Sequence, residues 1–200
     1  GGVHQSHAGV LSSEAGPVLA RHRLQVDWHG DDHKVFAKET RELTFYHTDG
    51  GLLVEFASQL QAADGKLKLD GDPQHAGFQF RASNDVNEKT AGQTYYIRPD
   101  GKDKPGSYKQ GQHQAWNAMS FVLDDDRFTV GYLDHPDNPK PAHYSERNYG
   151  RFGSYFVAET SGEKTIDVNY RLWIQAGEME VEDVAAHARN FVEPLKVTVK

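Results

Sequence analysis

Apolar residues recur at every second position in most segments of this 200-residue chain, and this period constrains the fold more than any other feature. Between Val18 and Trp28, for example, apolar residues fill one set of alternate positions, while Arg, Gln and Asp fill most of the other set. A period of two is typical of a β-strand with one buried face. His22 belongs to the apolar set, where we expect a core or rim residue rather than a ligand. The chain is therefore expected to consist mainly of strands.

Turn signals separate the strand-like segments. Residues 49–51 (DGG) lie between two of them, as in a hairpin, and residues 124–126 (DDD) lie between another two. Residues 83–114 are polar and rich in Gly, Asn, Asp and Lys, so we expect a long excursion that carries one short strand. The predicted strands cover residues 18–28, 35–46, 52–60, 66–69, 77–82, 94–98, 117–123, 127–133, 153–158, 165–175 and 195–199.

Only the end of the chain shows a helical period. Apolar residues between Val181 and Val192 recur at helical spacing, acidic residues come early and Arg189 comes late, which suits the helix dipole. Pro194 is expected to end this helix. Strands followed by one C-terminal helix predict an all-β, mainly antiparallel β-sandwich, and the length suits a single domain over residues 1–200.

Composition and missing motifs argue against several classes of function. The net charge of −7 and the lack of a basic run argue against a nucleic-acid partner. There is no cysteine, hence no disulfide, no thiolate zinc site and no cysteine nucleophile. No apolar run is long enough for a membrane span, and residues 1–10 lack a signal-peptide pattern. The phosphate-loop, dinucleotide, serine-hydrolase and H-E-x-x-H motifs are missing too.

The segment from Asp134 to Phe156, DHPDNPKPAHYSERNYGRFGSYF, concentrates residue types that suit a functional site. It holds two histidines, two arginines, acidic residues and several aromatic residues between two strand-like segments. Its three prolines predict a long irregular loop. Long polar loops are usually functional or disordered, and the aromatic content argues against disorder. We therefore expect the site on this loop.

One chemistry that suits this loop is metal binding. His135 and His143, flanked by carboxylates, are weak candidates for ligands of a divalent metal ion, the one cofactor that the sequence leaves open. Their spacing matches no compact metal signature. His4 and His7 have a spacing that suits a further pair of ligands, although so near the chain end we expect a solvated tail.

The second chemistry is carbohydrate binding. Sugar rings stack on aromatic faces while Arg, Asp, Asn and His bind the hydroxyl groups, and this loop offers that mixture beside Trp116 and Trp173. A His and a Glu on opposite sides of a sugar ring would serve as acid and base.

A structural role is the competing interpretation. Asn138, Arg147 and Tyr149 would then only pin a long loop through side-chain hydrogen bonds. Arg81 lies on the strand face opposite Phe80, where it is either a surface or a site residue, and we favour the surface.

Five segments carry a resemblance to a known family: HPDNPKPAHYSERNYGRFGSYF, AGFQFR, TYYIRPDG, WNAMSFVL and RLWIQAGEMEVEDV. They resemble a bacterial family of unknown function that is often labelled methane oxygenase PmoA-like. The resemblance covers nearly the whole chain, and its specific part is H-P-D-N-P followed by R-x-Y-G-x-F. Members usually carry an upstream P-H-H-R-G segment and a tryptophan-bearing stretch, and both are missing from this sequence. The resemblance thus implies an amino-terminally truncated member that lacks part of its site.

The resemblance also implies a fold and a setting. The fold would be a β-sandwich similar to the galactose mutarotase-like supersandwiches. The setting would be bacteria that degrade polysaccharides and often export such proteins, which implies a periplasmic or secreted location.

These observations lead to a first hypothesis and two alternatives. The first hypothesis is a carbohydrate-associated enzyme that uses acid-base chemistry, with His135, His143 and Glu146 as catalytic residues. The alternatives are a non-catalytic carbohydrate-binding module and, from the family label, a metal-dependent oxidase. A small molecule or an oligosaccharide is the expected partner, and exposed strand edges make a homo-oligomer plausible. The residues expected to bind the ligand are Asn138, Arg147, Tyr149, Trp116 and Arg81.

Overall fold

A nine-stranded sheet is the largest element of the computed structural model, which describes residues 2–105, 114–193 and 198. Its strands are β1 (His4–Ala15), β2 (Leu19–His29), β3 (Val35–Thr48), β4 (Gly51–Ala62), β7 (Tyr95–Arg98), β8 (Gly101–Asp103), β9 (Trp116–Leu123), β10 (Asp126–Asp134) and β14 (Thr165–Ala176). Their order is β1-β2-β3-β4-β14-β10-β9-β7-β8, and each neighbouring pair is antiparallel. The strand predicted at residues 195–199 lies outside the described residues, except for residue 198.

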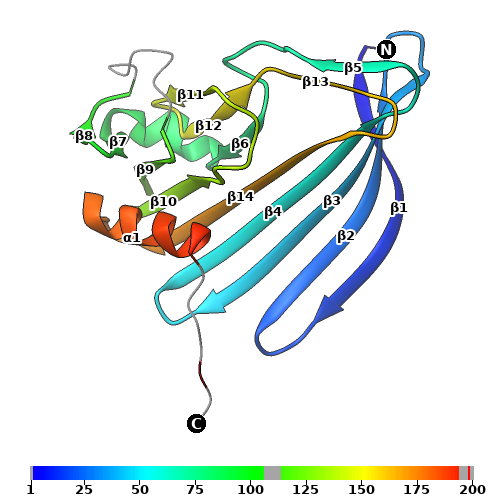
Figure 1. Ribbon diagram of the computed structural model, residues 1–200. Helices are drawn as coiled ribbons and strands as arrows, with labels where there is room; N and C mark the ends of the chain where they lie inside the picture. The colour runs from blue at the N-terminus through cyan, green and yellow to red at the C-terminus, as the bar shows by residue number, and fades with distance from the viewer. Residues whose placement is uncertain (1, 106–113, 194–197, 199–200) are drawn as a thin grey trace.

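The remaining elements cover the middle of this sheet on its two faces. A small sheet has the order β11-β12-β6 and consists of β6 (Phe78–Arg81), β11 (Ala142–Arg147) and β12 (Arg151–Phe156). Figure 1 shows it over one face of the central strands, with helix α1 (Val181–Val192) against the other face. The strands β5 (Lys66–Leu69) and β13 (Ala158–Ser161) form a separate pair, and the short helices η1 (Val86–Thr90) and η2 (Ala91–Gln93) precede β7.

The predicted fold class is confirmed. The described residues are mostly antiparallel strands with one C-terminal helix, and the predicted alternation and hairpins correspond to real strands. Among the described residues, no helix is long and apolar enough to cross a membrane. The likeness to the galactose mutarotase-like supersandwiches is implied by the sequence resemblance alone.

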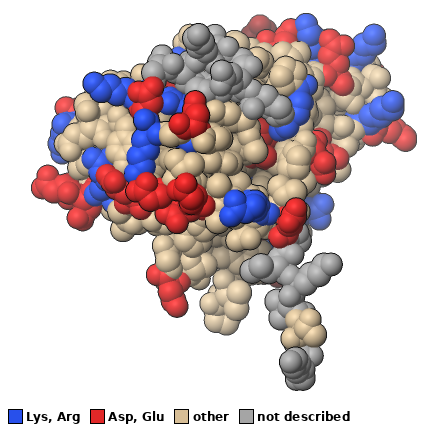
Figure 2. Space-filling model, turned by 60° about the vertical axis from the view of Figure 1, so that its left-hand side comes forward, with Lys and Arg blue, Asp and Glu red and all other residues tan. Residues whose placement is uncertain are grey.

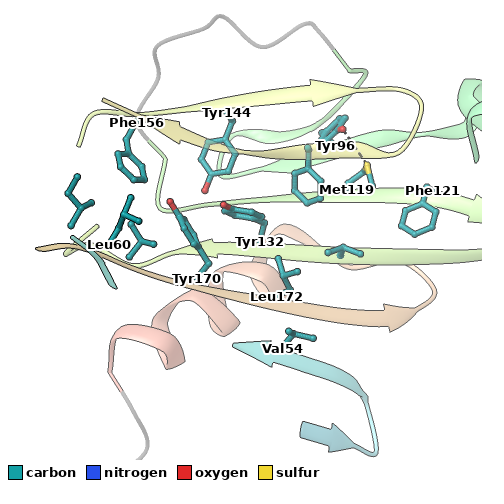
Figure 3. Packing of buried hydrophobic residues seen from close by; sticks show 14 of the residues in the cluster. Val54, Leu60, Tyr96, Met119, Phe121, Tyr132, Tyr144, Phe156, Tyr170 and Leu172 are labelled. Atoms are coloured by element: carbon teal, nitrogen blue, oxygen red, sulfur yellow. Dashed lines mark hydrogen bonds between the residues drawn. The ribbon is translucent and has the colours of Figure 1, made fainter. Parts of the chain in front are cut away.

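Aromatic side chains fill the space between the small sheet and the central strands. In Figure 3, Tyr144 of the small sheet points toward Tyr132 and Tyr170 of the large sheet. The rings of Tyr132 and Tyr144 pack edge to face at 5.7 Å, a geometry that aromatic pairs favour. The buried Tyr132 hydroxyl donates to the carbonyl oxygen of Phe78 at 3.0 Å, and burial raises the pKa of Tyr132. This core holds the small sheet in place.

A second, smaller core lies between α1 and the other face of the large sheet. The helix begins where the Glu180 backbone N–H donates to the Asp183 carboxylate at 2.9 Å, which completes a capping box. Residues buried in this second core are Ile97, Trp116, Ala118, Leu133, Met179 and Val184.

Two expectations about individual segments are wrong. His4 and His7 do not belong to a tail, because they lie in β1 and pair with His29 and Val26 of β2. Almost all of β1 is exposed, so its side chains carry no period of two, and only its backbone pairing identifies it as a strand.

The segment from Asp134 to Phe156 is likewise not one long loop. Its prolines all precede Ala142, so the backbone N–H groups of the later residues are free to pair. The second half therefore forms the hairpin β11–β12, and only residues 135–141 are irregular.

Candidate functional site

The hairpin β11–β12 has two faces with different chemistry, because successive strand residues point to opposite sides. Tyr144, Glu146 and Phe152 point inward to the large sheet, and all three are buried. His143 and Arg147 alternate with them and point outward. The predicted catalytic pair of His143 and Glu146 is thus divided between the two faces.

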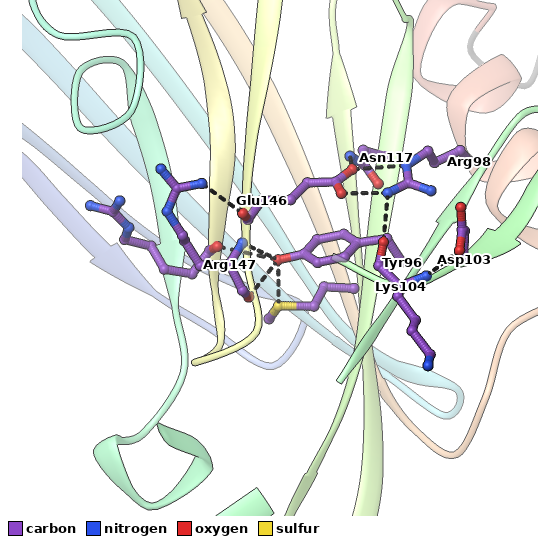
Figure 4. A network of polar contacts seen from close by, with 9 residues as sticks. Tyr96, Arg98, Asp103, Lys104, Asn117, Glu146 and Arg147 are labelled. Carbon is purple, nitrogen blue, oxygen red and sulfur yellow. Dashed lines mark hydrogen bonds and ion pairs between the residues drawn. The ribbon is translucent and has the colours of Figure 1, made fainter. Parts of the chain in front are cut away.

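On the inner face, Glu146 is held by a buried ion pair. Arg98 of β7 donates from Nε to Glu146 Oε1 at 2.9 Å, and its second guanidinium nitrogen donates to the other carboxylate oxygen. Asn117 Nδ2 adds a hydrogen bond of 2.8 Å to Oε1 (Figure 4). The two charged side chains are 4% and 2% exposed, and such two-point pairs of Arg and carboxylate are strong. The carboxylate is already engaged, so the proton-transfer role of Glu146 stays a prediction without geometric support.

Tyr96 of β7 connects the turn of this hairpin to the large sheet through hydrogen bonds. Its hydroxyl lies 2.9 Å from the Arg147 carbonyl oxygen and 3.2 Å from that of Arg151. The hydroxyl also accepts the Arg147 backbone N–H at 3.0 Å. Burial raises the pKa of Tyr96, which keeps the hydroxyl neutral and able to donate. The residues at the two strand ends, Arg147 and Arg151, therefore have fixed backbone positions.

On the outer face, three arginines form a row across the small sheet. Arg147 of β11 lies opposite Arg151 of β12, and Arg151 lies opposite Arg81 of β6. Side chains of residues directly opposite each other share a face, with Cβ atoms about 5 Å apart, and like charges in such positions destabilise a sheet. We name Arg81, Arg147 and Arg151 the arginine row.

The arginine row has no acidic partner in the part of the chain that the structure describes. None of its guanidinium nitrogens lies within 4.0 Å of a carboxylate oxygen. Some cations elsewhere are paired with carboxylates: Lys102 lies 2.8 Å from Glu180 and Arg127 3.4 Å from Glu178. Figure 2 shows a face of the molecule on which basic and acidic side chains lie together in this way.

The contacts of the row are all to neutral acceptors. Arg147 donates to the Glu146 carbonyl oxygen at 2.8 Å, and Arg81 reaches Asn84 Oδ1 at 3.4 Å. Arg151 donates to the Gln74 carbonyl oxygen at 2.8 Å, and its Nε is buried with no hydrogen-bond partner. Its guanidinium also lies 5.7 Å from the Tyr149 ring centre. The row therefore retains unused donors and forms no ion pair with the described residues.

A turn at residues 70–77 lies against the same face. Gln74 anchors it, because its carbonyl oxygen accepts bonds from Arg151 and, at 3.2 Å, from Ser145 of β11. The turn approaches β12 so closely at Gly77 (φ +84°) that a Cβ atom there would lie 2.0 Å from the Ser154 carbonyl oxygen. Only glycine suits this position.

The turn carries an Asp–His pair. Asp72 accepts the Gln74 backbone N–H at 2.9 Å and also contacts His75 Nδ1. The Gln74 N–H first, and then His75, lower the pKa of Asp72, and the charge of Arg147 contributes in the same direction. The pair therefore lies within electrostatic reach of the arginine row.

The irregular residues 135–141 form a separate, mainly structural unit. Asn138 is buried and binds the backbone of Asn169 twice, at 2.8 and 2.7 Å, and Lys140 pairs with Asp134 at 2.9 Å. The His135 ring contacts Phe191 of α1 with ring centres 5.1 Å apart. A cavity of about 440 Å³ lies here, lined by Ala115, Leu133, Asp134, Pro136, Lys140, Ala188, Phe191 and Val192.

The structure therefore divides the predicted site residues. It brings Arg81, Arg147 and Tyr149 together on the outer face. It places Trp116 in the core under α1, 6% exposed, where its ring offers no free stacking face. His135 lies toward α1, and the described residues contain no group of three or more His, Cys, Asp or Glu side chains suited to a metal ion.

Sequence reasoning missed three members of this surface. Arg151 occupies the unspecified position before the phenylalanine of R-x-Y-G-x-F, and its place just before the predicted strand at residues 153–158 could have suggested a cross-strand partner. Asp72 and His75 gave no signal, because their place beside the row depends on how the 70–77 turn packs on β11 and β12.

A family model for a family of unknown function, DUF6807, matches residues 2–189. A search of curated proteins found no match. The family description names no activity, so the arguments for function depend on the geometry of the outer face.

Proposed function

The chain belongs to this family of unknown function, and we propose that it binds an acidic carbohydrate on the arginine row. The observation that carries the proposal is the alignment of three arginines across three strands with no carboxylate within 4.0 Å among the described residues. The protein has a net charge of −7, so acidic side chains were available to neutralise this row. No acidic side chain forms an ion pair with the row among the described residues, and a ligand that supplies the negative charge would explain this.

The guanidinium group determines which charged group the ligand should carry. The planar N–H donors of a guanidinium group match two oxygens of a carboxylate or sulfate. Such charge-assisted hydrogen bonds are about twice as strong as hydrogen bonds between neutral groups.

The length of the row favours a saccharide over a single small anion. Neighbouring strands lie about 4.8 Å apart, so the outer members of a three-strand row are separated by about 10 Å at their backbones. One sulfate ion is too small to engage the whole row, whereas a sugar chain with carboxylate or sulfate groups spans it. The Tyr149 ring, next to Arg151, would stack on a sugar face.

The other hypotheses have less support. The acid-base enzyme loses its expected pairing of His143 with Glu146, and the metal-dependent oxidase depends on the resemblance alone. A site completed by an upstream segment, a periplasmic or secreted location and self-association remain predictions.

Isothermal titration calorimetry tests the proposal with four probes: an oligogalacturonate, a sulfated oligosaccharide, a neutral glucan oligosaccharide of equal length, and inorganic sulfate. We expect one of the acidic oligosaccharides to bind, the neutral one to fail and inorganic sulfate to bind more weakly. We also expect affinity to fall as salt rises, because salt screens exposed charges.

Arginine variants locate the binding surface. Arg147→Ala and Arg151→Ala should each weaken binding at least about tenfold, since a charged hydrogen bond contributes about 1.5–3 kcal/mol. Arg23→Ala is the matched control, because Arg23 is an exposed arginine on β2, far along the sheet order from β9 and β10. Equal binding of the neutral glucan, or unchanged binding by both row variants, would refute the proposal.

A further inference from the structure

His75 is a titratable group on the turn beside the arginine row, and the binding proposal leaves it unused. Its Nδ1 contacts the Asp72 carboxylate, and its side chain is 60% exposed. A carboxylate at Nδ1 favours the tautomer with the proton on that nitrogen, which leaves a lone pair on Nε2. In the described part of the chain, Nε2 has no hydrogen-bond partner. This is the arrangement of a general base.

Two hydrogen bonds and one electrostatic effect place the turn that carries this base beside the row. Arg151 and Ser145 both donate to the carbonyl oxygen of Gln74, the residue before His75. In addition, the charge of Arg147 contributes to the low pKa of Asp72. The Asp–His pair and the arginine row therefore belong to one surface, and a ligand carboxylate held by the row would place its neighbouring carbon atoms near the turn.

We propose, resting on the proposed function above, that His75 accepts a proton in the β-elimination of a uronate-containing oligosaccharide. Arg147 and Arg151 would neutralise the sugar carboxylate, which makes the hydrogen on the adjacent carbon more acidic. Nε2 of His75 takes that proton, and the electron pair of the broken C–H bond forms a carbon–carbon double bond.

The same electron movement breaks the bond from the next ring carbon to its glycosidic oxygen. The leaving oxygen takes up a proton from the His75 imidazolium or from water. The products are one shorter saccharide and one saccharide with an unsaturated uronate at its new end. The step needs no oxidant, reductant or added water.

The experiment follows the unsaturated product by its ultraviolet absorbance, with oligogalacturonate, oligoalginate and oligohyaluronan as substrates, alongside calorimetric binding. We expect His75→Ala to lower turnover at least about a hundredfold, the usual contribution of a general base, with less than about a threefold change in binding. Asp72→Asn should lower turnover by less than His75→Ala does, because it changes only the hydrogen-bond partner of His75 Nδ1. His47→Ala is the control, since His47 is an exposed histidine on β3.

The outcomes separate the two proposals. Binding of an acidic oligosaccharide without any unsaturated product overturns the elimination and leaves the binding function intact. Turnover by His75→Ala at the wild-type rate overturns the role of His75. A lack of binding to any acidic probe overturns both.

Discussion

Glu146 and Arg147 are neighbours in β11, yet the two faces of the small sheet give their charges opposite surroundings. Glu146 points inward and is bound by Arg98 and Asn117. Arg147 points outward beside another arginine, Arg151, and contacts only a neutral carbonyl oxygen. The inner charge has a direct counter-ion, whereas no carboxylate oxygen of the described residues lies within 4.0 Å of the outer charge.

This difference teaches how to distinguish a structural charge from a functional one. A buried charge must be paired because desolvation is costly, so pairing at Glu146 follows from folding alone. A row of like charges gains nothing for stability, and we propose that a ligand accounts for its presence. Substitutions on the inner face should therefore change stability, and those on the outer face should change binding.

The largest effect is expected when one partner of the inner pair is removed. Arg98→Met leaves Glu146 buried without its counter-ion, which typically costs about 3–5 kcal/mol. Urea denaturation measures this loss. Arg98→Met combined with Glu146→Leu should recover most of it, because no charge then remains buried. A single variant as stable as the wild type would show that the inner pair is not structural.

The next largest effect is expected at the connection between the two faces. Tyr96→Phe removes the hydroxyl that contacts the carbonyl oxygens of Arg147 and Arg151, and unsatisfied buried polar groups cost about 1–3 kcal/mol. Thermal denaturation would report the loss, and calorimetry should show weaker binding of the acidic oligosaccharide as the row loses its fixed positions. If the variant loses stability but binds the oligosaccharide as the wild type does, the Tyr96 hydroxyl does not position the arginine row for binding.

A smaller, pH-dependent effect is expected at Glu39, a buried carboxylate outside the small sheet. Burial alone would raise its pKa, but hydrogen bonds from Arg41, Ser58 and Trp28 together lower it below the usual value of 4.5. The stability that Glu39 contributes is therefore present above about pH 4.5 and is lost as the pH falls through the lower pKa of the folded state.

Glu39→Gln tests this sign. The variant should be about 1 kcal/mol less stable than the wild type near pH 7, with a smaller difference at acid pH, since a hydrogen bond to a charged group exceeds one to a neutral group. Denaturation series between pH 3 and pH 7 measure the difference. A difference in stability between the two proteins that grows as the pH falls would contradict the lowered pKa of Glu39.

The smallest effect on stability is expected at the outer face. Arg81→Gln removes one of three neighbouring like charges, so stability should stay within about 0.5 kcal/mol of the wild type or rise slightly. Binding of the acidic oligosaccharide should nevertheless weaken. A clear loss of stability would show that Arg81 has a structural role and would weaken the contrast between the faces.

Much of the fold could be predicted because a half-buried strand leaves a period of two in its own residues. The strands at residues 18–28 and 165–175 were visible in this way, and the helix that begins at Val181 was visible from its helical period. The strand β1 was not, since both of its faces are largely exposed. The strand β11 was missed, and only the second half of β12 was predicted, because the prolines before Ala142 suggested that the segment was irregular.

Less of the candidate site could be predicted. The sequence by itself determined that Arg81 lies near the end of a strand, and that a proline-rich loop follows the strand at residues 127–133. Only the tertiary structure decided that Glu146 is enclosed by Arg98, and that Asp72 and His75 lie beside the arginine row. Periodicity records which side of a strand a residue faces, because burial acts on each strand separately. The identity of the partner across that face depends on contacts between segments far apart in the chain, which no local pattern encodes.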